Sequence, residues 1–152
     1  MNPLLKAAEN VKEFFTPRPS ASSGLKQAVN ATRGTVLAEK LELAGTGGSR
    51  RKGLLGRDGL LPGEGLWIAP CESVHTFFMR FSIDLVYLDR KHKVKKIRSS
   101  VGPWRLSACF SAHSVLELPV GTISRSQTER GDTVEILPAQ VIEEIDDPLR
   151  VR

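Results

Sequence analysis

Short runs of alternating apolar and polar positions dominate the middle of the chain. In residues 35–43, Leu41 and Leu43 alternate with Lys40 and Glu42, which is the pattern of a strand with one buried face. Similar runs, separated by turn residues, predict further strands over 66–69, 83–88, 94–98, 115–118 and 133–137. The pattern predicts a mainly β (β-rich α+β) fold: a compact barrel- or sandwich-like domain of short, mostly antiparallel strands with one or two short helices.

Two short helices are expected between these strands. One is predicted over 49–57, with Ser49 as its N-cap, and the other begins at Thr122 and ends before Gly131. The strands on either side of 89–93 are predicted to form a hairpin.

The segment 74–81 has largely apolar side chains on both faces. Val74 and Phe78 alternate with Phe77 and Phe81 along it. A strand that is apolar on both faces is expected at the centre of a fold, where both faces are covered. We therefore predict that 74–81 is a central strand.

The chain divides into three parts. Residues 1–33 predict an amphipathic helix and a linker, because apolar residues recur at helical spacing as far as Phe15 and prolines follow. Residues 34–137 form the predicted β-rich domain. Residues 138–152 form an acidic C-terminal segment, in which 141–145 are compatible with a last edge strand.

Composition narrows the class of protein. A length of 152 residues, with 40% hydrophobic and 26% charged residues, suits one domain with a substantial core. No apolar run reaches the roughly 20 residues of a membrane-spanning helix. Charged residues are spread through the first 15 residues, unlike a secretory signal, so we expect a cytoplasmic protein. Two cysteines are too few for the disulfide framework of a small secreted domain.

Several short sequence pieces occur in a characteristic order and spacing. They are GLLGR at 53–57, LPGEGL at 61–66, HTFFMR at 75–80, IDLVYLD at 83–89, VLELPVG at 115–121 and Gly131-Asp132. Together they resemble the domain of unknown function family 192, an uncharacterised ancient conserved group, over about residues 35–137. The resemblance implies a compact β-rich domain without an established activity, cofactor or catalytic residue. Where hairpins of the family often carry glycine, this chain has His92, which a left-handed turn accommodates at some cost.

Charged residues within apolar stretches indicate the preferred candidate site. An isolated buried charge is costly, so Arg80 is expected to pair with Asp84 or Glu117, either structurally or in a pocket for an anionic or amide-bearing ligand. Trp104 is expected either to contact a ligand or partner or to cap one end of the barrel. His75 is the last of these candidate residues, and its alternative role is that of a buried core residue. The preferred function is a non-catalytic binding or accessory module that recognises a small ligand or partner protein through His75, Arg80, Asp84, Trp104 and Glu117.

A basic hairpin supports a first alternative, a nucleic-acid-associated protein. Its cations could follow a phosphate backbone; they are Arg90, Lys91, Lys93, Lys95, Lys96 and Arg98. No aromatic residue lies between Tyr87 and Trp104 to stack on a base. Lysines on edge strands also serve to prevent aggregation, so the hairpin has a purely structural explanation as well.

Two Cys-x-x-x-His spacings, Cys71 with His75 and Cys109 with His113, suggest two further kinds of chemistry. Four residues along a strand span about 13 Å, whereas two ligands of one zinc ion lie about 4 Å apart, so we predict no metal site. A Cys–His hydrolase, pairing either cysteine with the histidine of the other spacing, is the second alternative, without a supporting sequence signature. We predict no cofactor, because no nucleotide-binding motif lies in a strand–turn–helix setting.

Overall fold

The computed structural model describes residues 24–139, in which strands predominate. The strands are β1 (Lys26–Asn30), β2 (Thr35–Ala44), β3 (Glu64–Ile68), β4 (Ser73–His75), β5 (Ile83–Leu88), β6 (Val94–Val101), β7 (Leu106–Ala108), β8 (Ser114–Pro119) and β9 (Val134–Pro138). Between them lie the short helices α2 (Gly47–Lys52) and α3 (Thr122–Ser126).

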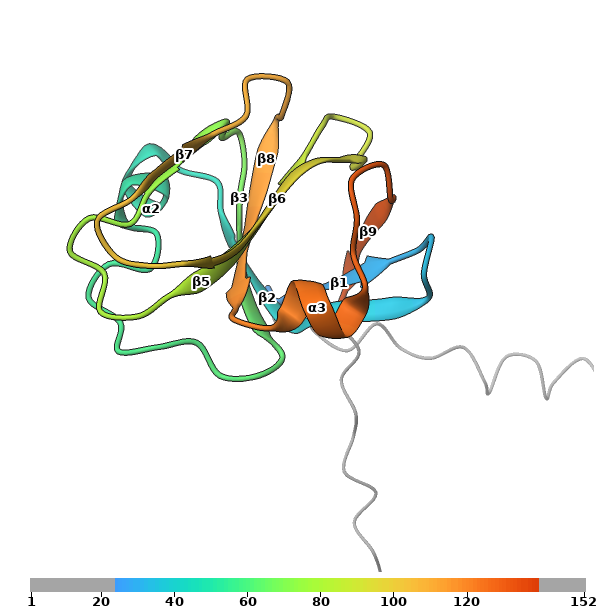
Figure 1. Cartoon of the computed structure of the whole chain (residues 1–152), viewed down its shortest axis with the longest axis horizontal. Coiled ribbons are helices and arrows are strands. Elements are labelled where there is room, and N and C mark those ends of the chain that lie inside the picture. Colours follow the sequence, from blue (N-terminus) through green and yellow to red (C-terminus); the bar gives the residue numbers. More distant parts are fainter. Residues whose placement is uncertain (1–23, 140–152) are drawn as a thin grey trace, which may run out of the picture.

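Seven of the strands form one curled sheet in the order β6-β5-β8-β3-β2-β1-β9 (Figure 1). Neighbouring strands pair antiparallel, except for β2 and β3, which run parallel. The two ends of the sheet approach one another where a bridge joins Lys93 to Thr133. The remaining strands, β4 and β7, form a separate two-stranded sheet. The predicted barrel-like, mostly antiparallel β domain with short helices is therefore confirmed.

Strand alternation places apolar side chains on both faces of the curled sheet. In β5, Val86 and Leu88 belong to one face, and Leu85 and Tyr87 to the other. The face inside the curl forms the barrel core, which comprises Ala28, Leu37, Ala38, Leu41, Val86, Leu88, Val94, Leu116, Leu118, Ile123 and Val134. The opposite face forms the outer core, which comprises Ala44, Leu54, Leu66, Ile68, Val74, Met79, Ile83, Leu85, Tyr87, Val101 and Val115.

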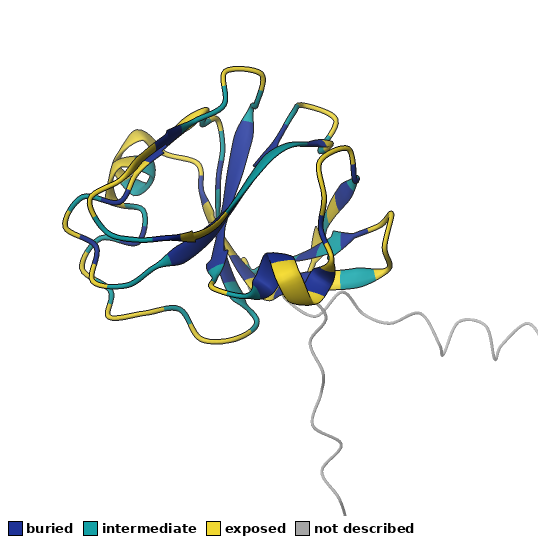
Figure 2. Ribbon diagram, viewed as in Figure 1, coloured by how far each residue is buried: buried dark blue, intermediate teal, exposed yellow. Residues whose placement is uncertain are grey.

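A layer of short and irregular elements covers the outer core. It consists of α2, the loop after it, and the sheet of β4 and β7 (Figure 1). Leu54 contributes to the outer core from the loop, Val74 from β4, and Met79 from the turn after β4. In Figure 2, β5 and β8 are largely buried, whereas much of this covering layer is exposed or intermediate.

The prediction of a central strand over 74–81 is wrong. Only Ser73–His75 are extended, and they pair with β7 in the covering layer. The chain then turns, with the Met79 amide donating to the Thr76 carbonyl over 3.2 Å. Phe78 in this turn has a φ of +64° and is exposed. Apolar composition on both faces was insufficient evidence for a strand, because these phenylalanines do not all enter a core.

The hairpin prediction is confirmed, and β6 extends further than expected, to Val101. His92 in its turn has a φ of +59°. This is the left-handed conformation expected at a place where hairpins of the family often carry glycine. Helix α2 begins earlier than predicted, because its N-cap is Thr46, and it ends at Lys52, before the predicted end at 57. Ser49 is the third helical residue, and its amide donates to Thr46 Oγ1 over 3.1 Å.

Strand β1 falls within the range assigned to the N-terminal helix and linker. It pairs with both β2 and β9, so the β domain extends at least to Lys26. The predicted helix before residue 24 and the predicted edge strand over 141–145 lie outside the described residues.

Candidate functional site

Glu117 is a carboxylic acid buried beneath the covering layer. It lies in β8, opposite Leu66 of β3 and Leu85 of β5. Only 3% of the residue is exposed, and its Oε2 atom has no hydrogen-bond partner in the described part of the chain. Burial raises the pKa of Glu117 to about 7, although the positive charge of Arg57 acts to lower it. Near neutral pH this carboxyl group can therefore donate as well as accept a hydrogen bond.

A pocket of about 420 Å³, named the Glu117 pocket, lies beside this side chain. Its walls come from α2 and the loop after it, the end of β3, and the segment that leads into β4. The lining includes Arg50, Arg51, Lys52, Leu54, Ile68, Cys71, His75, Met79 and Glu117. This volume falls in the range of natural small-molecule sites, about 300–1,000 Å³.

The local sequence positions α2 at the edge of this pocket. Thr46 and Ser49 form a capping box, in which each side chain accepts a hydrogen bond from the other residue's amide. Gly53 ends the helix with a φ of +46°, a conformation that favours glycine. A Cβ atom on Gly53 would lie 3.8 Å from Glu117 Oε2, so the end of the helix packs close to the carboxyl group.

Three consecutive cations of α2, Arg50, Arg51 and Lys52, line the Glu117 pocket. The Nη1 atom of Arg50 donates to the Gly45 carbonyl over 2.7 Å. Within residues 24–139, none of these cations forms an ion pair with a carboxylate. The pocket thus combines a buried carboxyl group with a cationic edge.

Cys71 lies in the wall that separates the Glu117 pocket from a second pocket. Its Sγ atom donates to the Ser73 carbonyl over 3.1 Å. Burial raises the pKa of the Cys71 thiol, and a thiol that donates to a carbonyl is held in its protonated form. The thiol is therefore poorly suited to act as a nucleophile at neutral pH, because the thiolate is the reactive form.

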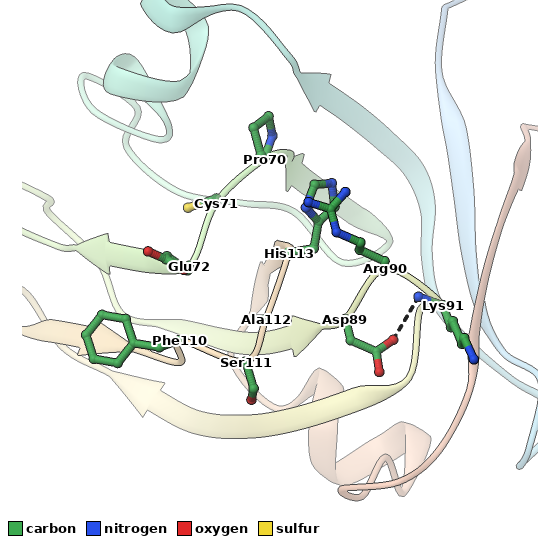
Figure 3. A pocket seen from close by; sticks show the side chains of 10 residues that line it. All are labelled: Pro70, Cys71, Glu72, Asp89, Arg90, Lys91, Phe110, Ser111, Ala112 and His113. Carbon is green, nitrogen blue, oxygen red and sulfur yellow. Dashed lines mark hydrogen bonds between the residues drawn. The ribbon is translucent and has the colours of Figure 1, made fainter.

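The second pocket, named the His113 pocket, has a volume of about 960 Å³ (Figure 3). In Figure 3, Cys71 and Phe110 lie on one side, and Arg90 and Lys91 lie on the opposite side. The Cys71 amide donates to the His113 carbonyl over 2.8 Å, so these residues meet through their backbones. The Cys71 sulfur points away from the His113 ring in Figure 3, an arrangement that does not form the Cys–His pair of a hydrolase.

The two Cys-x-x-x-His spacings do not converge on one point. In residues 24–139, no three or more His, Cys, Asp or Glu side chains are grouped so as to hold a metal ion. The Cys109 amide donates to the Glu72 carbonyl over 2.8 Å, which continues the pairing of β4 with β7. Both Cys71 and Cys109 pack against the outer core.

The predicted ligand-binding residues do not form a single site. His75 and Glu117 line the same pocket, whereas Arg80, Asp84 and Trp104 are not among the residues that line it. The expected pairing of Arg80 with Asp84 or Glu117 is wrong. Arg80 Nη1 instead donates to Asp58 Oδ1 over 2.6 Å on the protein surface.

Asp84 connects three elements of the fold. It is fully buried, and its Oδ1 atom accepts from the Ser100 amide of β6 over 2.9 Å. Its Oδ2 atom accepts from the Ile123 amide at the start of α3 over 3.0 Å. Trp104 is 56% exposed and stacks on Phe77, outside both cores.

The basic hairpin distributes its cations in several directions. Its exposed tip carries Arg90, Lys91 and Lys93. Lys96 belongs to the outer-core face, where its Nζ atom donates to the Ala108 carbonyl over 2.7 Å and lies 5.9 Å from the centre of the Tyr87 ring. Strand alternation places Arg98 on the same face, whereas Lys95 lies where the pairing of β5 with β6 is irregular. These cations therefore do not form one continuous phosphate-binding face.

Arg50, Arg51 and Lys52 were not among the predicted site residues. A run of cations immediately before the GLLGR piece is visible in the sequence. Its position beside Glu117, which is far along the chain, depends on how the covering layer packs.

The fold and these pockets define a class: a small, strand-rich domain whose candidate binding site lies outside the barrel core, beneath a layer of loops. The chain belongs to the family described as Uncharacterized ACR, domain of unknown function 192, whose model matches residues 28–136. The resemblance found in the sequence is therefore confirmed.

Relatives from Thermococcus and Pyrococcus species carry the name UPF0127 protein. The relative from Thermococcus sibiricus is 32% identical over 116 residues, which cover 70% of this chain and 72% of the relative. The relative from Thermococcus kodakarensis is 30% identical over 121 residues, which cover 74% of each chain. The relative from Pyrococcus abyssi is 32% identical over 114 residues, which cover 70% of this chain and 94% of the relative.

Two solved structures share the fold. A Sinorhizobium meliloti protein, described as a candidate transcription regulator, matches with a TM-score of 0.65 and 21% identity over 77% of this chain and 98% of its own. A Novosphingobium aromaticivorans protein of unknown function matches with a TM-score of 0.62 and 25% identity over 79% of this chain and 92% of its own. In the part of the chain that the structure describes, no helix has the length and apolar character needed to cross a bilayer.

Proposed function

We propose that this domain is a non-catalytic binding module that recognises a small ligand in the Glu117 pocket. The observation that carries the proposal is the buried Oε2 atom of Glu117, which has no hydrogen-bond partner in residues 24–139 and lies beside a pocket of ligand size. A buried polar atom without a partner costs about 1–3 kcal/mol. A ligand that forms a hydrogen bond with this atom removes that cost, so the site favours an occupied state.

The lining of the pocket indicates the chemistry of the ligand. Glu117 offers a hydrogen-bonding group at the buried end, and Leu54 and Ile68 offer apolar contact. Arg50 and Lys52 at the edge attract an anionic group. The best match is a small molecule with an apolar body, one hydrogen-bonding group and one anionic group.

The geometry gives less support to the two alternatives. A hydrolase needs an activated thiolate, whereas the pKa of Cys71 is raised and its thiol bonds to a carbonyl. A nucleic-acid interface based on the basic hairpin needs its cations on one face. Lys96 is instead held by the Ala108 carbonyl.

The proposal is tested by native mass spectrometry of the full chain purified from its own cells without denaturation. The wild-type protein is expected to carry a bound molecule in addition to its own mass of 16.7 kDa. The variant Glu117→Gln keeps the shape of the side chain but cannot act as a carboxyl group, so it is expected to lose most of this species.

Glu135→Gln is the matched control. Glu135 is exposed on β9, so this substitution makes the same change of side chain at a position away from the pocket. It should retain the bound molecule. Equal retention by wild-type protein and the Glu117 variant would exclude the Glu117 pocket as the binding site. A wild-type protein without any bound molecule, and without a thermal shift on addition of small organic acids, would contradict the proposal as a whole.

A further inference from the structure

Thr76 joins the turn after β4 to the loop before β7. Only 1% of Thr76 is exposed, and its amide donates to the Arg105 carbonyl over 2.9 Å. Its hydroxyl donates to the Gly102 carbonyl over 2.6 Å and accepts from the Arg105 amide over 2.9 Å. The Thr76 carbonyl accepts from the amides of Trp104 and Met79. A single buried side chain and its backbone therefore fix the two loops against each other.

The two loops hold bulky aromatic residues in an unfavourable backbone conformation. Phe78 has a φ of +64° and is 72% exposed, and Trp104 has a φ of +61° and is 56% exposed. Large side chains rarely adopt this left-handed conformation, which persists only where the surrounding structure enforces it. The hydrogen bonds of Thr76 supply that enforcement, and the result is two apolar rings presented to solvent.

These residues belong to a larger surface, the aromatic platform, which consists of His75, Phe77, Phe78, Trp104 and Leu106. The rings of His75 and Phe77 stack at 5.2 Å, and those of Phe77 and Trp104 stack at 5.8 Å. The ring of Phe78 lies 4.7 Å from that of Trp104. Leu106 of β7 is directly opposite His75 of β4, so both side chains point outward on the same face of the two-stranded sheet.

Exposed cations lie beside two parts of the aromatic platform. Arg105 is exposed directly beside Trp104. His75 also lines the Glu117 pocket together with Arg51 and Lys52, which are exposed. The exposed acidic residue that lines the same pocket is Glu72, so cations outnumber carboxylates at this edge.

We propose that the aromatic platform binds an anionic lipid surface, with Phe78 and Trp104 entering the headgroup region while the cations contact lipid phosphates. Tryptophan is favoured at this depth of a bilayer, and each nearby lysine or arginine adds attraction to anionic lipid. The rings of Phe77 and Trp104 already cover each other's faces, which leaves less ring area for stacking on nucleic-acid bases. Phe77, Phe78, Trp104 and Leu106 line none of the pockets described above, so the surface suits insertion better than enclosure of a ligand.

The experiment measures binding of the full chain to vesicles of phosphatidylcholine with and without phosphatidylglycerol. We expect sedimentation with the anionic vesicles at low salt, weaker binding at high salt, and a blue shift of the tryptophan fluorescence. Phe78→Ser is expected to weaken binding about tenfold, because it removes most of an inserted apolar side chain. Arg105→Gln is expected to weaken binding to anionic vesicles about fivefold.

Phe110→Ser is the matched control, because Phe110 is also highly exposed but lines the His113 pocket instead of belonging to the aromatic platform. It should leave vesicle binding unchanged. Absence of binding at low salt, or equal binding by wild-type protein and Phe78→Ser, would overturn the proposal. Binding of single-stranded DNA that Phe78→Ser abolishes, without vesicle binding, would also overturn it and assign the surface to nucleic acid. None of these outcomes depends on a ligand in the Glu117 pocket.

Discussion

The barrel core and the outer core lie on opposite faces of the same curled sheet but are closed in different ways. Strands surround the barrel core, and its packing is tight: a Cβ atom on Gly65 would lie 2.9 Å from a methyl carbon of Leu118. The outer core is closed by a short helix, loops and a two-stranded sheet (Figure 2). Buried polar atoms without a described partner occur on both sides of the sheet: Trp67 packs against the barrel core, whereas the pocket-lining Glu117 Oε2 lies on the outer side.

The difference shows where a small β domain can accommodate a binding site. A face enclosed by strands is occupied by regular apolar packing, and an added polar group there would lack a partner. Loops and short helices leave pockets between them and bring polar backbone close to the core. Both the Glu117 pocket and the aromatic platform belong to the covering layer of the outer core.

The largest expected difference between the two cores is their response to a cavity. Leu116→Ala in the barrel core should lower the free energy of unfolding by about 4 kcal/mol, because surrounding strands cannot move inward to fill the space. Leu54→Ala in the covering layer should cost about 2–3 kcal/mol, because a loop can collapse. Urea unfolding measures the free energy that each variant loses. Equal losses, or a larger loss for Leu54→Ala, would show that the covering layer is as rigid as the barrel.

A smaller expected effect is the pH dependence of stability that the carboxyl group of Glu117 gives to the outer core. The pKa of Glu117 is about 7 in the folded protein against 4.5 ordinarily, so the unfolded chain loses this proton first as pH rises. Wild-type protein should therefore lose about 3 kcal/mol of stability between pH of about 4 and about 8, relative to Glu117→Gln. Stability should stop falling once the pH exceeds the folded pKa.

Unfolding free energies of the ligand-free proteins across this pH range provide the measurement. All other titrating groups are common to both proteins, so the difference between the curves isolates Glu117. Parallel curves would show that the carboxyl group is solvated or paired in solution.

The smallest expected effect concerns the hairpin that borders the outer core. Lys96→Met should lower the free energy of unfolding by about 1 kcal/mol, because the Ala108 carbonyl loses its donor. Lys93→Met at the exposed tip should change it by less than about 0.5 kcal/mol. Equal effects in thermal or urea unfolding would mean that Lys96 is as free as Lys93 and available to a partner.

The candidate site was only partly accessible from the sequence. Glu117 and His75 were predicted as site residues because a charged or polar group in an apolar stretch needs a partner, and both residues do line one pocket. Asp84 was predicted as a site residue for the same reason, yet its carboxylate accepts hydrogen bonds from two backbone amides within the fold. A sequence pattern shows that a charged group will be buried, but the identity of its partners depends on segments far away in the chain.

By itself, the sequence determined the elements that are short apolar runs bounded by turn residues. The hairpin of β5 and β6 follows from two such runs on either side of 89–93, and β8 follows from the run that ends before Pro119, because short apolar runs between turns are typical of buried strands. The tertiary structure alone decided the conformation of 74–81. There, hydrogen bonds between Thr76 and a loop almost thirty residues away outweigh local apolar character and turn Phe78 outward.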